Sequence, residues 1–287
     1  MKTKRSYLFV PATSTKMLNK ALGSEADCVI FDLEDAVAIN EKQEARELAK
    51  NYLQNNQPSK EVFIRINDFT TQFWREDLEA AIEAGASGVI VPKAESAINM
   101  KLICEIALVK LERENRDIHS FTVLPLIETA SGVQNAYEVA TAHYLINRLI
   151  FGSIDYSLDV DCELSDDGIE LLYARSQIVN ASKAAGVGSP IDAVYPDLSN
   201  EQGLAGEALR AKKLGFKAKL AIHPKQLNPI HDIFTPSQKE IDDAQEIVNA
   251  FEGAEQQGVA SIAVGNKLVD YPVYKKAKGL LEFVSIY

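Results

Sequence analysis

Eight short apolar runs recur along the chain, each followed by a polar turn and then by a helical pattern. The runs lack the polar alternation of a half-exposed strand, which indicates strands that are buried on both faces. Strands and helices that alternate at this spacing predict βα units around a parallel sheet. The predicted strands are Tyr7–Pro11, Cys28–Leu33, Val62–Asn67, Gly88–Lys93, Thr122–Glu128, Leu149–Ser153, Ile191–Pro196 and Lys219–His223.

Eight βα units predict an α/β fold that closes into a (β/α)₈ TIM barrel, with an open doubly wound sheet as the alternative. Three glycines follow helical patterns and are expected to cap those helices: Gly85, Gly186 and Gly215. The predicted helices are Glu41–Gln54, Arg75–Ala84, Ala97–Arg113, Asp167–Ala185 and Gly203–Leu214.

The length of 287 residues suits one barrel of about 250 residues with a short appendage. We therefore expect a TIM-barrel domain over residues 1–235 and a C-terminal helical arm over residues 236–287. The arm has a helical pattern at Ser237–Glu252, a turn at Gly253–Gly258 and a final segment. It is too short for its own core, so it is expected to pack on the barrel or on a neighbouring subunit, or to form a lid.

The formal charge of −11 argues against a nucleic-acid or anionic-membrane partner, because both require a basic surface. The hydrophobic fraction of 46% and the charged fraction of 25% are those of an ordinary globular protein. No apolar run approaches the roughly 18 residues of a membrane span, and no signal peptide is evident. Three cysteines without metal-type spacing, Cys28, Cys104 and Cys162, indicate reduced thiols and a cytoplasmic protein.

Active sites of TIM barrels lie at the C-terminal ends of the strands, where this chain places many carboxylates. Carboxylates that meet in a dry pocket repel one another, and a hard cation is the simplest remedy. Mg²⁺ accepts one or two carboxylates together with waters and substrate oxygens. The polar residues at the predicted strand ends are Asp32, Glu34, Asp35, Arg65, Asn67, Lys93, Glu128, Asp155, Asp192, Asp197 and His223.

Glu128 and Asp155 are the predicted metal ligands. Glu128 ends Leu-Pro-Leu-Ile-Glu and Asp155 lies in Phe-Gly-Ser-Ile-Asp, so the two come from adjacent predicted strands and can share one ion. Each could instead be a helix N-terminal acid that answers the helix dipole. Two such residues on neighbouring strands, with small residues nearby, favour the metal site.

Three further residues suggest other chemistry. Arg65 ends an apolar strand, and its planar fork suits either a substrate carboxylate or enolate, or a buried carboxylate partner. Lys93 raises the alternative of a Schiff-base aldolase, but the nearby carboxylates favour a lysine that pairs with one of them. His223 is a candidate base, although a single histidine at a strand end is more often structural.

Eight motifs, in order along the chain, resemble the citrate lyase β-subunit-like family within the wider HpcH/HpaI aldolase group. The resemblance covers nearly the whole chain. The motifs are Arg5-Ser-Tyr-Leu-Phe-Val-Pro11, Phe31-Asp-Leu-Glu-Asp-Ala-Val37, Ile64-Arg-Ile-Asn67, Val91-Pro-Lys-Ala-Glu95, Pro125-Leu-Ile-Glu-Thr129, Phe151-Gly-Ser-Ile-Asp-Tyr156, Ile222-His-Pro-Lys-Gln226 and Val269-Asp-Tyr-Pro-Val273.

The resemblance implies a trimeric or hexameric TIM barrel that acts on coenzyme A thioesters with Mg²⁺, or with Mn²⁺ in its place. It implies that Glu128 and Asp155 bind the metal and that Arg65 holds the oxo-acid carboxylate and the enolate. The other implied roles are metal-water orientation by Asp32, Glu34 and Asp35, oxo-acid contacts by the amides of Gly152, Ser153, Ile154 and Asp155, coenzyme A contacts by Lys16 and the His223 turn, and catalysis by Asp270 of a neighbouring subunit.

The implied activity is Mg²⁺-dependent cleavage of a 3-hydroxy-dicarboxylyl thioester, citryl-CoA-like, into an acetyl thioester and a 2-oxo acid. The alternatives are a malyl-CoA or citramalyl-CoA lyase, a malate synthase or thioesterase, and a β subunit active only in a complex with a carrier protein. Two departures put the substrate in doubt. Ala12 replaces the glycine usual in the family, and Asp68 replaces its usual proline.

Overall fold

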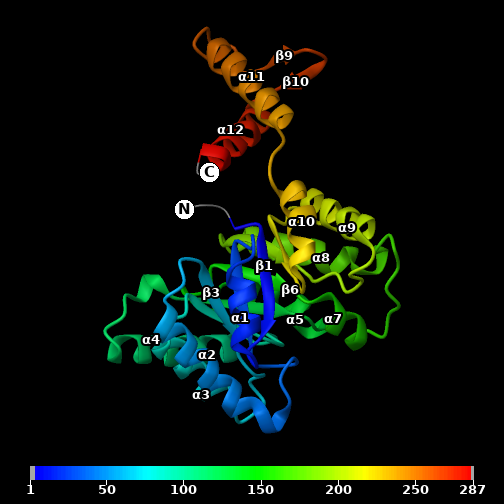
Figure 1. The fold of residues 1–287 in the computed structure, drawn as a ribbon. Coiled ribbons are helices and arrows are strands. Elements are labelled where there is room, and N and C mark those ends of the chain that lie inside the picture. Colours follow the sequence, from blue (N-terminus) through cyan, green and yellow to red (C-terminus); the bar gives the residue numbers. More distant parts are fainter. Residues whose placement is uncertain (1–3, 286–287) are drawn as a thin grey trace. The chain divides into compact units, whose positions relative to one another are not determined.

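The computed structural model describes residues 4–285 of the chain (Figure 1). These residues form two compact units, one over residues 4–234 and the other from Thr235 onward. None of the helices described here is long and apolar enough to cross a membrane.

Eight parallel strands form the first unit, and β8 pairs with β1 to close the barrel. The predicted (β/α)₈ barrel is confirmed, and its closed strand order excludes the open doubly wound sheet. The strands are β1 (Ser6–Pro11), β2 (Cys28–Asp32), β3 (Glu61–Arg65), β4 (Gly88–Val91), β5 (Thr122–Ile127), β6 (Arg148–Phe151), β7 (Gly188–Asp192) and β8 (Ala218–Ala221).

Helices follow the strands and surround the barrel (Figure 1). The helices of this unit are α1 (Thr15–Leu22), α2 (Lys42–Asn56), α3 (Trp74–Glu83), α4 (Ala97–Arg113), α5 (Ala130–Gln134), α6 (Ala136–Ala140), α7 (Ser153–Asp159), α8 (Leu172–Ala184), α9 (Glu201–Leu214) and α10 (Leu227–Phe234). Four short 3₁₀ turns are η1 (Ile39–Glu41), η2 (Ile118–Ser120), η3 (Ile169–Leu171) and η4 (Pro224–Gln226).

Side-chain alternation along each strand divides the apolar residues between two layers. On β2, Val29 and Phe31 pack outward against the helices, whereas Cys28 and Ile30 point into the barrel. The inner layer therefore fills the barrel and leaves an apolar floor beneath the carboxyl ends of the strands.

Each predicted strand overlaps an observed one, but several predicted strands run past the hydrogen-bonded ladder, and the seventh shares only Ile191 and Asp192 with β7. Asn67, Lys93, Glu128 and Ser153 lie just beyond β3, β4, β5 and β6, in the loops at the barrel mouth. The predicted helix caps are confirmed at the three glycines, which all have positive φ angles: 79° at Gly85, 73° at Gly186 and 122° at Gly215.

The second unit contains α11 (Gln238–Glu255), a two-stranded hairpin and α12 (Tyr271–Ser285). The hairpin, β9 (Ile262–Val264) with β10 (Lys267–Val269), was not predicted from the sequence. Phe251 of α11 packs against Tyr271 and Tyr274 of α12, with ring centroids 5.1 and 4.8 Å away. This unit therefore has a small apolar core of its own.

Candidate active site

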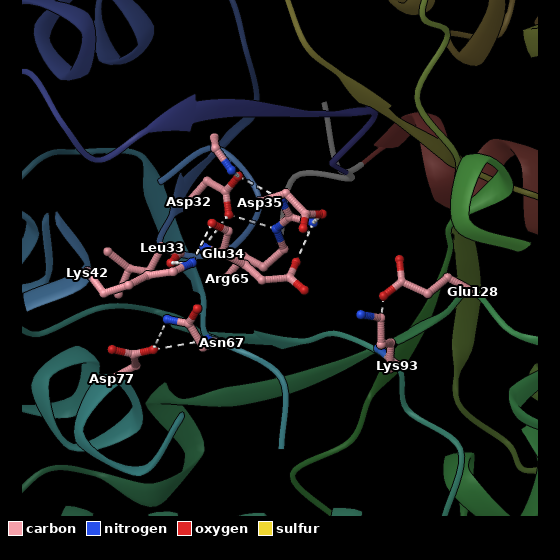
Figure 2. A network of polar contacts seen from close by, with 11 residues as sticks. Asp32, Leu33, Glu34, Asp35, Lys42, Arg65, Asn67, Asp77, Lys93 and Glu128 are labelled. Carbon is pink, nitrogen blue, oxygen red and sulfur yellow. Dashed lines mark hydrogen bonds and ion pairs between the residues drawn. The ribbon is translucent and has the colours of Figure 1, made fainter. Parts of the chain in front are cut away.

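Arg65 is the last residue of β3 and lies beside Asp32, the last residue of β2, because the two strands pair in parallel register. Nε donates to Oδ1 of Asp32 at 2.7 Å and Nη2 donates to Oδ2 at 2.6 Å (Figure 2). This two-point contact fixes the plane of the guanidinium. Burial opposes its charge, but the hydrogen bonds and charge of Asp32 outweigh burial and raise the pKa of Arg65.

The remaining guanidinium nitrogen, Nη1, meets two more carboxylates from the loop after β2. It lies 2.8 Å from Oε2 of Glu34 and 3.3 Å from Oδ2 of Asp35. The Glu34 contact is between charges, since Oε2 has no aligned hydrogen bond. Burial raises the pKa of Glu34 to about 7, opposed by Arg65 and reinforced by Asp35 and Asp32. Glu34 is therefore easier to protonate than an ordinary glutamate.

Glu128 follows β5 and is buried at the barrel mouth, with 3% of its surface exposed. Its Oε1 accepts a hydrogen bond from the Lys93 amide at 2.9 Å (Figure 2). Gly152 lies against the same side chain: a Cβ there would stand 2.7 Å from Oε2 and 2.6 Å from Cβ of Glu128. A residue without a side chain at position 152 is thus needed for Glu128 to keep its place.

Asp155 lies in the first turn of α7, after β6, which pairs with β5. Burial, reinforced by the neighbouring Asp155 charge, raises the pKa of Glu128 to about 8. No hydrogen bond from residues 4–285 reaches Oε2 of Glu128 or the Asp155 carboxylate. Two mutually repelling carboxylates with free oxygens fit a divalent cation.

Within residues 4–285 there is no group of three or more His, Cys, Asp or Glu residues arranged to hold a metal. The candidate site is therefore a carboxylate pair, and its other ligands would be water and substrate oxygens. That number of protein ligands is usual for Mg²⁺.

One pocket of about 330 Å³ at the barrel mouth brings most of the predicted site residues together. Its floor is apolar, formed by Phe9, Leu126, Val194 and Leu220. Its wall and rim include the polar residues Asp32, Asp35, Arg65, Glu128, Ser153 and Asp155, together with Gly152 and Ile154. Glu34 does not line the pocket and reaches it only through Arg65.

Three other predicted residues lie outside this pocket. Lys16 is exposed on α1. His223 accepts a hydrogen bond on Nδ1 from the Lys225 amide at 3.1 Å, a local cap of η4. Asp270 belongs to the second unit, where its Oδ1 accepts from the Val273 amide at 3.2 Å. Their proposed roles toward a ligand remain predictions.

The expected ion pair of Lys93 was wrong. Its backbone amide contacts Glu128, whereas its ammonium has no carboxylate within 4.0 Å among the described residues. Lys93 also adopts a left-handed backbone with φ of 46°. Burial opposes its charge, but Glu34 and Asp68 raise the pKa of Lys93. A Schiff-base nucleophile needs a lowered pKa, so this environment disfavours that alternative.

The prediction that Asp192 lies at the barrel mouth was also wrong. Asp192 is fully buried between Arg175 of α8, 2.8 Å from Oδ1, and Lys219 of β8, 2.7 Å from Oδ2. Glu207 of α9 contacts the same two cations at 3.2 and 2.6 Å. These four charges form a buried network between the barrel and its helices. Asp197 is exposed and bonds locally to Ser199.

Two buried polar residues that support the mouth were missed. Asp77 of α3 accepts both the backbone and the side-chain amide of Asn67, at 3.0 and 2.6 Å. Lys42 of α2 donates to the carbonyls of Leu33 and Glu34. Both residues sit in first turns of helices, where the sequence gives no sign that a polar side chain points inward.

Comparisons with known proteins identify the family of this chain. The model of the HpcH/HpaI aldolase/citrate lyase family matches residues 5–224. The citrate lyase subunit beta of Haemophilus influenzae is 37% identical over 284 residues, which cover 98% of this chain and 97% of that protein. A (3S)-malyl-CoA thioesterase of Cereibacter sphaeroides is 32% identical over 267 residues, which cover 93% of this chain and 89% of that protein.

A solved structure of the protein CitE from Mycobacterium tuberculosis, in complex with magnesium, acetoacetate and coenzyme A, has the same fold. It matches with a TM-score of 0.80 and 28% sequence identity, over 98% of each chain. The family match spans residues 5–224, and the relatives above 30% identity extend over nearly the whole chain. This chain belongs to the HpcH/HpaI aldolase/citrate lyase family.

Proposed function

We propose that this protein is a Mg²⁺-dependent carbon–carbon lyase. Its substrate would be a 3-hydroxy acyl thioester of the citryl-, citramalyl- or malyl-CoA type, and its products an acetyl thioester and a 2-oxo acid. The observation that carries the proposal is that the Arg65 guanidinium and the Glu128–Asp155 pair line one pocket. A fixed cation and a metal site within one pocket suit a reaction that develops negative charge on two oxygens.

Glu128 and Asp155 would hold the Mg²⁺, and the presence of magnesium in the CitE complex of Mycobacterium tuberculosis supports that choice of metal. The bound ion supplies Lewis-acid polarisation of the substrate's hydroxyl and carboxylate oxygens. Gly152 and the Lys93 amide fix the Glu128 carboxylate in place before substrate arrives. Amides at the start of α7, from Ser153 onward, would face the oxo acid.

Cleavage moves one proton and one electron pair. A carboxylate accepts the hydroxyl proton, and Asp35 is the candidate because its side chain is 66% exposed and lines the pocket. The carbon–carbon bond then breaks, its electrons pass to the thioester as an enolate, and the oxo acid forms. Return of the proton from that carboxylate, directly or through water, to the enolate carbon completes the acetyl thioester. Arg65 would stabilise the enolate oxygen without rearrangement, since its plane is already fixed.

Binding of the coenzyme A portion is proposed on the side of Lys16 and His223, where the resemblance places it. We also propose a homotrimer or hexamer in which Asp270 from a neighbouring subunit reaches the pocket. An acyl carrier protein in place of coenzyme A, with activity only in a complex, is the alternative.

Product analysis tests the proposal. The purified protein is offered citryl-, citramalyl- and malyl-CoA with Mg²⁺ or EDTA, and products are identified by mass spectrometry. Acetyl-CoA and a 2-oxo acid, formed only with Mg²⁺, support the lyase. Free coenzyme A and the intact hydroxy acid would instead support a thioesterase, the activity named for the 32% identical relative. No reaction with any of the three contradicts the proposal for free coenzyme A thioesters.

A further inference from the structure

Lys42 begins α2, and its side chain reaches back under the loop that follows β2. Its Nζ donates to the Leu33 carbonyl at 2.9 Å and to the Glu34 carbonyl at 2.6 Å (Figure 2). Lys42 is 7% exposed and does not line the pocket. It therefore contacts the loop that carries the acids without being placed to contact substrate.

A lysine in this position is costly for the fold. A cation in the first turn of a helix opposes the helix dipole. Burial lowers the pKa of Lys42, although Glu34 and Asp32 act in the opposite direction. Its ammonium has no carboxylate within 4.0 Å in the described part of the chain, so the two carbonyls are its main compensation. The position is better explained by what those carbonyls hold.

The two peptides that Lys42 holds, Leu33–Glu34 and Glu34–Asp35, set where two acids point. Glu34 and Asp35 both approach Nη1 of Arg65, at 2.8 and 3.3 Å. The amides of Glu34 and Ala36 donate to the Asp32 carboxylate, at 3.0 and 3.4 Å. A rotation of either peptide would therefore move the acids and loosen the Asp32 carboxylate that fixes Arg65.

We propose that Lys42 is a positioning residue for the Arg65 site: by holding the Leu33 and Glu34 carbonyls, it fixes the surrounding carboxylates against the guanidinium. The catalytic consequence rests on the proposed function, whereas the movement of the loop can be measured without any reaction.

The same helix provides a matched control. Lys42, Arg46 and Lys50 are spaced by four residues along one face of α2. Lys50 is 26% exposed and bonds to Glu83 of α3, at 2.5 Å. Lys50→Met thus removes a cation of the same helix face that has no contact with the loop after β2.

The first measurement is hydrogen exchange in the full-length protein. In Lys42→Met, the amides of Glu34 and Ala36 should exchange at least about tenfold faster than in the wild type. A tenfold change corresponds to roughly 1.4 kcal/mol in the free energy of local opening. Exchange in β5 should stay unchanged, as should the loop in Lys50→Met. Lys42→Gln keeps an N–H donor and should give an intermediate rate. Unchanged loop protection in both Lys42 variants overturns the proposal, whatever their activity.

The second measurement is turnover of whichever thioester the wild type cleaves. Lys42→Met should lower kcat by about 10–100-fold, since a misplacement of about 1 Å can cost 10²-fold. The KM for the thioester should change little, and Lys50→Met should keep wild-type kcat. A merely structural role would lower the melting temperature and leave kcat per folded molecule unchanged, which would overturn the proposal.

A double-mutant cycle locates the effect. If Lys42 acts through the three carboxylates around Arg65, Lys42→Met should add little to an Asp32→Asn/Glu34→Gln/Asp35→Asn background. Effects that simply multiply would show that Lys42 acts elsewhere and would overturn the proposal. If the wild type cleaves no thioester but the loop loses protection in Lys42→Met, the proposed function fails and the positioning role stands.

Discussion

Arg65 is the residue on which the proposed chemistry most depends, because its charge and its planar geometry both matter. Arg65→Lys keeps the charge but loses the two-point contact with Asp32. We expect kcat to fall by about 10²–10³-fold in Arg65→Lys, nearly as far as in Arg65→Ala. Steady-state kinetics check this, and a lysine variant with near wild-type turnover would show that the fixed guanidinium is not needed.

A substitution at Gly152 tests whether the Glu128 carboxylate must keep its position. In Gly152→Ala, the new Cβ would meet Glu128 at 2.6–2.7 Å, well inside van der Waals contact. We expect Mg²⁺ affinity, measured by calorimetry, to fall by about tenfold or more while the protein stays folded. Gly206→Ala is the control, since its Cβ would lie at an ordinary 3.5 Å from Arg210. Unchanged Mg²⁺ affinity in Gly152→Ala would argue against Glu128 as a ligand.

At the scale of the elements, the buried network around Asp192 joins β7 and β8 to α8 and α9. Asp192→Asn leaves Arg175 and Lys219 short of one buried counter-charge. Breaking a buried pair in this way typically costs about 3–5 kcal/mol. We therefore expect a loss of that size in the free energy of unfolding by urea. A loss below about 1 kcal/mol would indicate that the network relaxes around the change.

The barrel was predictable from sequence because its buried strands are continuous apolar runs, such as β2 and β5. The start of β7 was missed because Gly188, Ser189 and Pro190 do not resemble a strand. The β9–β10 hairpin was missed because its strands have only three residues each. The residues of so short a strand do not show by themselves that it pairs, because the pairing depends on contacts with residues outside the strand.

The site was predictable wherever a polar residue ends a strand, as at Arg65 and Glu128, because the barrel brings strand ends together. Asp192 also ends a strand, but its side chain points outward to buried cations. The sequence does not distinguish the two directions when the strand boundary is uncertain. Lys42 was missed for a different reason: its partners are backbone carbonyls, which leave no sequence signal.

At the scale of the whole molecule, stability should depend on pH and Mg²⁺ together. Glu34 and Glu128 have raised pKa values, about 7 and about 8. Between the ordinary carboxyl pKa near 4.3 and these values, the folded protein binds more protons than the unfolded chain. Because of these two groups, the free energy of unfolding should fall as pH rises through that window.

A bound cation favours the ionised pair, so Mg²⁺ should raise the melting temperature more at pH 8.5 than at pH 6. Thermal unfolding with Mg²⁺ or EDTA checks this. Glu128→Gln should abolish the Mg²⁺ effect at both pH values. An equal Mg²⁺ effect in that variant would place the cation elsewhere.

Asp270 belongs to the second unit, so its proposed role concerns the assembly. Asp270→Asn keeps an oxygen to accept from the Val273 amide but removes the charge. If Asp270 acts on a neighbouring subunit, mixing inactive Asp270→Asn and Arg65→Ala proteins under subunit exchange should restore part of the activity. No recovery, with hybrid oligomers verified by mass spectrometry, would contradict action between subunits.

The most direct test of the central claim is the rate of 2-oxo acid release from the thioester panel by the wild type and by Glu128→Gln, each with Mg²⁺ and with EDTA. We predict release by the wild type with Mg²⁺, and a loss of about 10²-fold or more with EDTA or in Glu128→Gln at either condition. EDTA-resistant release, or an active Glu128→Gln protein, would contradict a metal-assisted cleavage at the pocket shared by Arg65, Glu128 and Asp155.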